Sequence, residues 1–215
     1  SVARYVQDAA PVVDDILARG KLPIIAGGTG LYIDNLIAGR EFAPFQPDSG
    51  LRETLQQRAR EEGLPALRAQ LEQVDPDAAA KIHPNDEKRI VRALEVFLST
   101  GKTITQHDRE SQEAPDRYTP LTIALNFRKR PDLWARIDRR VDEMMEHGLE
   151  REVRQLLADG VPQSCTAMQA IGYKEMAAAL LGDGDTAAAA EEIKLRSRQY
   201  AKRQRTWFRH NQAAK

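Results

Sequence analysis

The segment Leu22-Pro-Ile-Ile-Ala-Gly-Gly-Thr-Gly30 decides the fold prediction. Its first five residues form a short apolar run, which is typical of a buried strand in a parallel sheet, and the glycines that follow are typical of a tight turn. The helical spacing of apolar residues over 1–19 and 31–38 predicts a helix before the strand and another after the turn. This order of elements predicts a doubly wound α/β sheet, in which ligands bind at the carboxyl ends of the strands.

A purely helical stretch separates that segment from the rest of the predicted sheet. Residues 42–47 are typical of a linker, and Asp48 or Ser49 can cap a helix that runs through 56–62 and ends at Gly63. The sequence therefore predicts three parts: a core α/β part, 1–43; an all-helical insertion domain, 44–118; and a second core α/β part with a basic C-terminal helix, 119–215.

Further helix starts are visible inside the insertion. Asp75 and Pro76 have the cap-then-proline order of a short helix, and Asn85 can cap a stronger one. The polar segment Gln106–Tyr118 lacks periodicity and predicts a loop. The insertion therefore contains no predicted strand.

Strand character returns at Thr119–Phe127, where large apolar residues alternate with smaller ones. Asp132 can then cap a helix, and Gly148 separates it from a second one. Two more helical stretches, over 175–181 and 186–209, complete the chain. The expected fold is thus α/β in class but predominantly helical overall.

Composition narrows the class of protein. The 215 residues are 41% apolar and 30% charged, which is typical of a folded globular chain. The longest apolar run, Met176–Leu181, is far shorter than the roughly 20 residues of a membrane span, and no secretory signal is visible. A single cysteine, Cys165, cannot form an internal disulfide, so a cytoplasmic location is expected.

Charge is balanced overall, with 32 basic and 32 acidic residues, but the C-terminal end is basic. From Ile193 to Lys215 there are eight Lys or Arg and no Asp or Glu. Cations interleaved with Tyr200, Trp207 and Phe208 favour RNA as a partner, because the rings can stack on unpaired bases while the charges neutralise phosphates. The alternative is a solvated helix face with the aromatic residues in the core.

Two further groups of cations have the spacing of one helix face. They are Lys88, Arg89 and Arg92, and Arg136, Arg139 and Arg140. Either group can bind phosphates. Either can instead pair with acidic residues of its own helix. These are Asp86, Glu87 and Glu95 for the first group and Asp138 and Asp142 for the second.

The turn Gly27-Gly28-Thr29-Gly30 can present backbone N–H groups and a hydroxyl to an anion at a helix N-terminus. The alternative is that the glycines only make a tight turn. No Gly-x4-Gly-Lys-Ser/Thr phosphate loop occurs in the sequence. Cys165 and the four histidines lack the spacing of zinc ligands.

Four motifs are spread over nearly the whole chain. They are LPIIAGGTGLY at 22–32, HPNDEKRIVRALE at 83–95, QAIGYKE at 169–175 and YAKRQRTWFR at 200–209. In their residues, order and spacing these motifs closely resemble the tRNA dimethylallyltransferase family, also called tRNA isopentenyltransferases, of the bacterial type.

The resemblance implies transfer of a dimethylallyl group from dimethylallyl diphosphate to N6 of the adenosine immediately 3′ of the tRNA anticodon. It also implies a P-loop kinase-like, nucleotide-binding sheet core with a helical insertion. The adenine must leave the base stack, because a stacked base cannot present N6 to an enclosed electrophile. Mg²⁺ would offset charge on the departing diphosphate, and a carboxylate would take the amine proton. The implied partners are the tRNA anticodon stem-loop and dimethylallyl diphosphate, with no membrane and a monomeric protein.

Two motifs of the family are not found in these residues. They are the glycine-rich phosphate loop and the Asp-Ser-x-Gln-Val-Tyr motif that carries the general base. In the family both precede the residues with which this sequence begins. We therefore expect an incomplete parallel sheet and no catalysis by this chain alone.

Individual site residues follow from the same resemblance. Thr29 matches the threonine that contacts tRNA near the reacting base, and it is the one catalytic candidate. Arg52 lies where a further tRNA contact is expected, and Arg136 and Arg139 match an element near the diphosphate. The other expected tRNA-binding residues are Lys88, Arg89, Ile90, Val91, Arg92, Gln169, Ala170, Ile171, Gly172, Tyr173, Lys174, Lys202, Arg203, Gln204, Arg205, Thr206, Trp207, Phe208 and Arg209.

Two other functions compete with this interpretation. The chain could be a stand-alone module that binds the tRNA anticodon loop without catalysis, which binding without turnover would indicate. It could also be a relative of nucleotide kinases, which the missing lysine-containing phosphate loop and the four motifs oppose.

Overall fold

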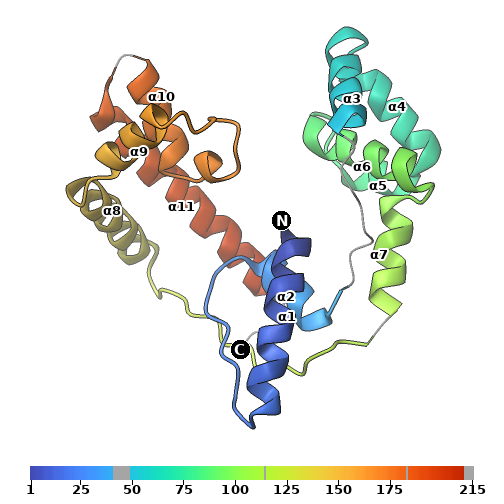
Figure 1. The fold of residues 1–215 in the computed structure, drawn as a ribbon, viewed down its shortest axis with the longest axis horizontal. Helices are drawn as coiled ribbons and strands as arrows, with labels where there is room; N and C mark the ends of the chain where they lie inside the picture. The colour runs from blue at the N-terminus through green and yellow to red at the C-terminus, as the bar shows by residue number, and fades with distance from the viewer. Residues whose placement is uncertain (41–48, 114, 183, 211–215) are drawn as a thin grey trace. The chain divides into compact units, whose positions relative to one another are not determined.

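The computed structural model describes residues 1–40, 49–113, 115–182 and 184–210, and these are predominantly helical, as predicted (Figure 1). The helices are α1 (Val2–Ala18), α2 (Gly30–Ala38), α3 (Ser49–Glu61), α4 (Leu64–Val74), α5 (Pro76–Lys81), α6 (Glu87–Thr100), α7 (Ile104–Glu113), α8 (Arg130–Glu146), α9 (Leu149–Ala158), the 3₁₀ turn η1 (Ala167–Gln169), α10 (Tyr173–Leu181) and α11 (Thr186–His210). None of the helices in these ranges is long and apolar enough to cross a membrane.

The chain divides into two compact units. The first comprises Ser1–Gly27 and Leu31–Pro120, and the second comprises Gly28–Gly30 and Leu121–Lys215. The three-part domain division stays a prediction.

Helices α1 and α2 of the first unit share a small apolar core. Its buried members are Val6, Ala10, Val13 and Leu36. Tyr118 packs against this core: its hydroxyl donates to Oδ1 of Asp14 at 2.7 Å, and its N–H donates to the carbonyl oxygen of Ile37 at 3.1 Å. The chain therefore leaves α2 and later returns to the same pair of helices.

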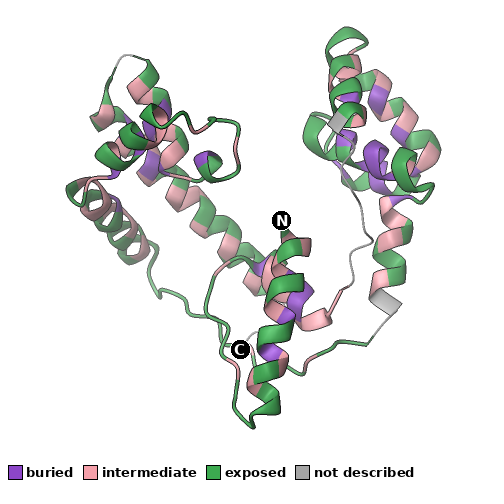
Figure 2. Cartoon of the chain, in the orientation of Figure 1, coloured by how far each residue is buried: buried purple, intermediate pink, exposed green. Residues whose placement is uncertain are grey.

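Helices α3 to α6 enclose a second core in the first unit, and α7 packs against it. Figure 2 shows its buried residues on the inner faces of these helices. The fully buried side chains are Leu55, Leu67, Leu71, Ile90 and Leu94. Gly63, with φ +86°, separates α3 from α4, because few other residues adopt that backbone conformation easily.

Asp75 joins three of these helices. It caps α5, as predicted, because Oδ1 accepts from the N–H of Ala78 at 3.1 Å. It also accepts from the hydroxyl and the N–H of Thr105 on α7, at 2.7 and 3.1 Å. Burial pushes the pKa of Asp75 up, but the hydrogen bonds from Thr105, Ala78 and Thr103 outweigh it and lower the pKa below its ordinary value.

Asp75 therefore predicts a loss of stability in acid. Because its pKa is lowered by folding, its contribution is present above the ordinary carboxylate pKa and is lost as the pH falls through the lowered value. Asp75→Asn should destabilise the α5–α7 contact by about 1–3 kcal/mol at neutral pH, since the amide cannot accept all these bonds. Hydrogen exchange of the α5 and α7 amides measures both effects. Equal protection in the variant and the unsubstituted chain would contradict this prediction.

Helices α8 to α11 of the second unit surround a third core. Its fully buried side chains are Val141, Val153, Met168, Met176 and Ile193. Gly148, with φ +95°, separates α8 from α9, as predicted. Gly172, with φ +107°, precedes α10, and its N–H donates to Oε2 of Glu175 at 2.9 Å.

The two strand predictions are wrong for the described residues. Residues 22–26 and 119–127 are not in strands, and Thr122 is a single bridge residue. Their apolar side chains are exposed, with Leu22 at 82%, Ile24 at 84% and Leu125 at 95%. A strand needs a partner to satisfy its backbone groups and a layer to cover its side chains, and the described residues supply neither.

Helix starts account for two other corrections. Asp86, not Asn85, caps α6, because its Oδ1 accepts from the N–H of Arg89 at 3.2 Å. Lys129 is the N-cap position of α8, and Asp132 lies in the first turn instead, after Pro131. The predicted linker 42–47 and Asp48 lie outside the described residues, and α3 begins at Ser49.

The predicted loop over 106–118 is wrong in its first half, which is helix α7. Thr103 and Gln106 explain this start by a reciprocal pair of bonds. The N–H of Gln106 donates to the Thr103 hydroxyl at 3.1 Å, and the N–H of Thr103 donates to Oε1 of Gln106 at 2.9 Å. This capping box starts a helix even though the residues that follow are polar all round.

Candidate nucleic-acid interface

The glycine turn lies against the C-terminal helix within the second unit. Gln204 of α11 donates from Nε2 to the carbonyl oxygen of Gly28 at 2.9 Å, a contact between residues 176 apart. A Cβ on Gly30 would overlap the indole of Trp207, so the ring packs directly on the glycine. Thr29, between these glycines, is exposed and immediately precedes α2. The structure thus joins the first and the fourth sequence motifs.

This contact predicts different effects for two alanine substitutions. Gly30→Ala should displace Trp207 at a cost of about 1–3 kcal/mol, because a rigid ring cannot yield to the new methyl group. Gly28→Ala meets only the flexible end of Gln204 and should cost about 1 kcal/mol or less. Trp207 fluorescence in a Trp134→Phe background reports the displacement. An unchanged emission spectrum in Gly30→Ala would contradict the expected displacement.

The outer part of α11 carries cations that no described carboxylate neutralises. Among residues 1–40, 49–113, 115–182 and 184–210, no ion pair involves Lys202, Arg203, Arg205 or Arg209, and all four are exposed. Tyr200 and Trp207 are partly exposed rather than core residues, and the guanidinium of Arg203 lies 5.6 Å from the centre of the Tyr200 ring. Exposed, unneutralised cations beside aromatic rings suit a phosphate backbone with unpaired bases.

The first half of α11 has cations that form ion pairs with α8. Nζ of Lys194 lies 2.7 Å from Asp142, and Nε of Arg198 lies 2.9 Å from Asp138, so both join α11 to α8. Hydrogen bonds to Asp142 and Glu191 raise the pKa of Lys194 to about 12, and the ammonium therefore stays charged. The basic segment thus divides into an inner structural half and an outer exposed half.

These pairs leave the α8 arginines exposed. Asp138 and Asp142, which could have neutralised them, bind α11 instead. Arg136, Arg139 and Arg140 form no ion pair with any residue that the structure describes. They are available to an external anion.

The third motif mainly builds the second unit. Ile171 and Tyr173 pack against its core, and the Tyr173 hydroxyl donates to Glu152 at 2.7 Å. The side chain of Gln169 donates to the carbonyl oxygen of Gln163 at 2.7 Å. Ala170 and Lys174 are exposed, and Lys174 is the one cation of this motif.

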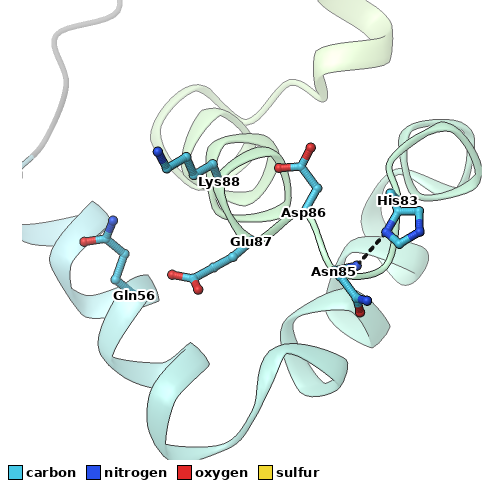
Figure 3. A pocket seen from close by; sticks show the side chains of 6 residues that line it. All are labelled: Gln56, His83, Asn85, Asp86, Glu87 and Lys88. Carbon is cyan, nitrogen blue, oxygen red and sulfur yellow. Dashed lines mark hydrogen bonds between the residues drawn. The ribbon is translucent and has the colours of Figure 1, made fainter. Parts of the chain in front are cut away.

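The second motif forms α6 and divides between core and surface. Ile90 and Val91 are buried, so their side chains lie in the core of the first unit. Lys88 and Arg89 are exposed, and Arg89 pairs with Asp86 at 3.3 Å. The motif also lines a pocket of about 520 Å³ with Gln56 of α3 (Figure 3).

Arg92 meets Arg52 of α3 on one buried carboxylate. Nη1 of Arg92 and Nη2 of Arg52 lie 3.0 and 2.7 Å from the same oxygen, Oε2 of Glu95. The Glu95 side chain is 0% exposed, while those of Arg52 and Arg92 are 44% and 45% exposed. The structure thus brings two predicted tRNA-binding residues together.

The pairs of Arg92 with Glu95 and of Arg89 with Asp86 confirm the alternative that these cations pair within their own helix segment. The sequence interpretation missed the contact of Arg52 with Glu95 and the full burial of that carboxylate. A signal was present: Glu95 lies one helical turn after Val91, on the apolar side of α6. It also missed the contacts of Gln204 and Trp207 with the glycine turn, for which no signal exists in the local sequence.

A metal site is not visible in the described ranges, which contain no group of three or more His, Cys, Asp or Glu side chains placed to hold an ion. Mg²⁺ is usually bound by one or two carboxylates together with substrate phosphates and water, so the Mg²⁺ that the resemblance implies stays a prediction.

Exposed cations beside a glycine turn at a helix N-terminus are typical of anion-binding proteins. Comparison with known proteins is more specific. The family model for IPP transferase matches residues 1–211. The chain belongs to the IPP transferase family.

Relatives within that family match nearly the whole chain. The tRNA dimethylallyltransferase of Geobacter sulfurreducens is 46% identical over 100% of this chain and 68% of its own length. That of Thermoanaerobacter sp. is 47% identical over 97% of this chain and 67% of its own length. The chain thus spans about two thirds of the length of these relatives.

Solved structures agree with this result. The full-length tRNA isopentenylpyrophosphate transferase of Bacillus halodurans matches with a TM-score of 0.65 at 38% identity, covering 100% of this chain and 65% of that one. A eukaryotic dimethylallyltransferase acting on tRNA matches with a TM-score of 0.73 at 30% identity, covering 97% of this chain and 52% of that one.

Proposed function

We propose that this chain is the tRNA-binding part of a tRNA dimethylallyltransferase. The reaction would transfer a dimethylallyl group from its diphosphate to N6 of the adenosine immediately 3′ of the anticodon and release diphosphate. The observation that carries the proposal is the 46–47% identity with proteins of that name over nearly the whole chain. The exposed cations of α11 support a polyanionic partner.

The outer half of α11 and the glycine turn would hold the anticodon arm. Lys202, Arg203, Arg205 and Arg209 would contact phosphates, because their charges are otherwise unneutralised in the described ranges. Trp207 would instead fix α11 on Gly30. Thr29, exposed at this contact, would meet the tRNA near the extruded adenine.

Arg136 and Arg139 of α8 would bind the diphosphate. Guanidinium groups suit its oxygens because their fork of donors matches phosphate geometry, and their fixed positive charge offsets the charge that develops on the leaving group. The general base that accepts the N6 proton has no counterpart among the motifs of this sequence. We propose that these 215 residues act as a monomer that binds tRNA but does not catalyse the transfer by itself.

The two exposed apolar segments support a further part of the proposal. Residues 22–26 and 119–127 have strand-like sequences without partners among the described residues. The relatives are longer by about a third of their own length. We propose that both segments become strands of a P-loop kinase-like parallel sheet when the rest of such a protein is present.

The test is tRNA binding by the Lys202→Ala/Arg203→Ala/Arg209→Ala variant. Each lost phosphate contact should lower the slope of log affinity against log salt concentration by about 0.7–0.9, so three contacts lower it by about 2 to 3. At 0.1 M salt this corresponds to a loss of affinity of about a hundredfold or more for an anticodon stem-loop. Fluorescence anisotropy across a salt series measures both quantities.

The matched control removes three cations that are already paired. Arg4, Arg19 and Arg154 each bind a carboxylate four residues away in the sequence. Their triple alanine variant should keep the affinity and slope within about threefold, since each loss of charge is partly offset locally. If the α11 variant behaved like this control, α11 would be an ordinary solvated helix face.

A stand-alone tRNA-binding module is the second candidate function. The observation that favours it is the absence from this sequence of the phosphate loop and general-base motif of the family. Binding without turnover, even after the chain is extended with a relative's N-terminal segment, would select this function.

A further inference from the structure

Glu95 occupies an unusual position for a carboxylate. It lies in the core side of α6, fully buried, and both of its arginine partners bind the single oxygen Oε2. Its other oxygen, Oε1, has no hydrogen bond within the described part of the chain. From this geometry we infer that Glu95 is a positioning residue that holds Arg52 and Arg92 together as a fork for an RNA phosphate. The inference rests on the proposed tRNA binding.

The two arginines share one oxygen of the buried carboxylate. Nη1 of Arg92 and Nη2 of Arg52 both bind Oε2 of Glu95. Each guanidinium has five N–H donors, and both arginine side chains remain nearly half exposed. A phosphate offers several acceptor oxygens, and paired guanidinium groups match its geometry.

Stability alone does not account for the cluster. A buried carboxylate with an unbonded oxygen carries a desolvation cost, and apolar residues in place of a buried ion triad commonly stabilise a fold as well or better. Two arginines brought close in space also repel each other unless a shared anion holds them. The arrangement is therefore better suited to presenting two cations side by side than to filling a core.

The cluster is continuous with a polar surface along α3 and α6. Gln56 lies one turn after Arg52 on α3, and Lys88 lies one turn before Arg92 on α6. Gln56 and Lys88 both line the 520 Å³ pocket, and Figure 3 shows their side chains on two different helices. The two arginines and the pocket thus lie on neighbouring turns of α3 and α6. An RNA backbone can contact both.

The Glu95→Gln variant distinguishes a positioning role of Glu95 from the effect of its negative charge on RNA binding. This variant keeps both arginines and gains one unit of positive charge, so simple electrostatics predicts equal or tighter RNA binding. Positioning by Glu95 predicts the opposite: a loss of about fivefold to eightfold in affinity for an anticodon stem-loop at 0.1 M salt, the value of one phosphate contact. The matched control is Glu62→Gln, which removes an exposed carboxylate bound to Arg58 on α3 and should bind at least as tightly as the unsubstituted chain.

A second variant guards against misfolding. Arg52→Met/Glu95→Leu/Arg92→Met replaces the ion cluster by apolar side chains and should keep its helical circular dichroism and thermal midpoint. Its affinity should fall, and its salt slope should drop by about 1.4 to 1.8, the value of two phosphate contacts. An unchanged slope in this variant, or binding by Glu95→Gln as tight as in Glu62→Gln, would overturn the inference while leaving tRNA binding intact. No binding by the unsubstituted chain would overturn the proposed function itself.

Discussion

Incubated with dimethylallyl diphosphate, Mg²⁺ and unmodified tRNA, the 215-residue chain is expected to produce no detectable dimethylallyl-adenosine. The sequence contains neither the family's phosphate loop nor its general-base motif. Loss of a positioned general base alone typically slows a reaction by about 10²–10⁴-fold, and loss of the phosphate cradle removes leaving-group stabilisation as well. Mass spectrometry of nucleosides from the digested tRNA measures the product.

The control for this experiment is a chain that carries the missing motifs. The N-terminal segment of the Geobacter sulfurreducens relative, which is 46% identical over the shared part, can be fused in front of Ser1. The fused protein should modify tRNA, whereas both proteins should bind the anticodon stem-loop. Comparable rates in the two proteins would show that the catalytic groups lie within the present sequence.

Removal of both arginines from Glu95 is expected to have the largest effect on stability. Arg52→Ala/Arg92→Ala leaves a fully buried carboxylate without a counter-charge. Breaking a buried ion pair in this way costs about 3–5 kcal/mol, and the lower end applies because both guanidinium groups are half exposed. Hydrogen exchange of α6 amides should become about a hundredfold faster. Exchange at the unsubstituted rate would contradict this expectation.

A third substitution supplies the control. Glu95→Leu, added to the two alanine substitutions, removes the unpaired charge and fills the site with an apolar side chain. Protection of the α6 amides should largely return. If it did not, the destabilisation would come from lost arginine packing rather than from the buried charge.

Local sequence was sufficient for most helices. Apolar spacing and glycine stops predicted α1, α2 and α3, and Asp75 before Pro76 predicted the start of α5. These features depend on residues within a few positions of one another. The errors at Asn85 and Asp132 were shifts of one to three residues between neighbouring polar side chains.

Patterns of neighbouring residues could not predict contacts between residues that are far apart in the sequence. The strand predictions failed because a strand is stabilised by partners elsewhere in the chain, and the described residues hold none for 22–26 or 119–127. The family resemblance singled out Arg52 and Arg92 as candidates, but the binding of both to Glu95 depends on the packing of α3 against α6. The prediction that they bind tRNA stays to be tested.

The exposed apolar segments also bear on how the protein behaves in concentrated solution. Uncharged, β-prone stretches such as Leu121–Phe127 are the kind that pair between molecules and begin aggregates. Both stretches contain features that oppose this. Pro23 and Pro120 remove a backbone donor near the start of each, and Lys21 and the run Arg128–Arg130 place positive charge at their ends. The prolines oppose backbone pairing with a second copy of the chain, and the cations repel that copy. Residues in this role are called gatekeepers.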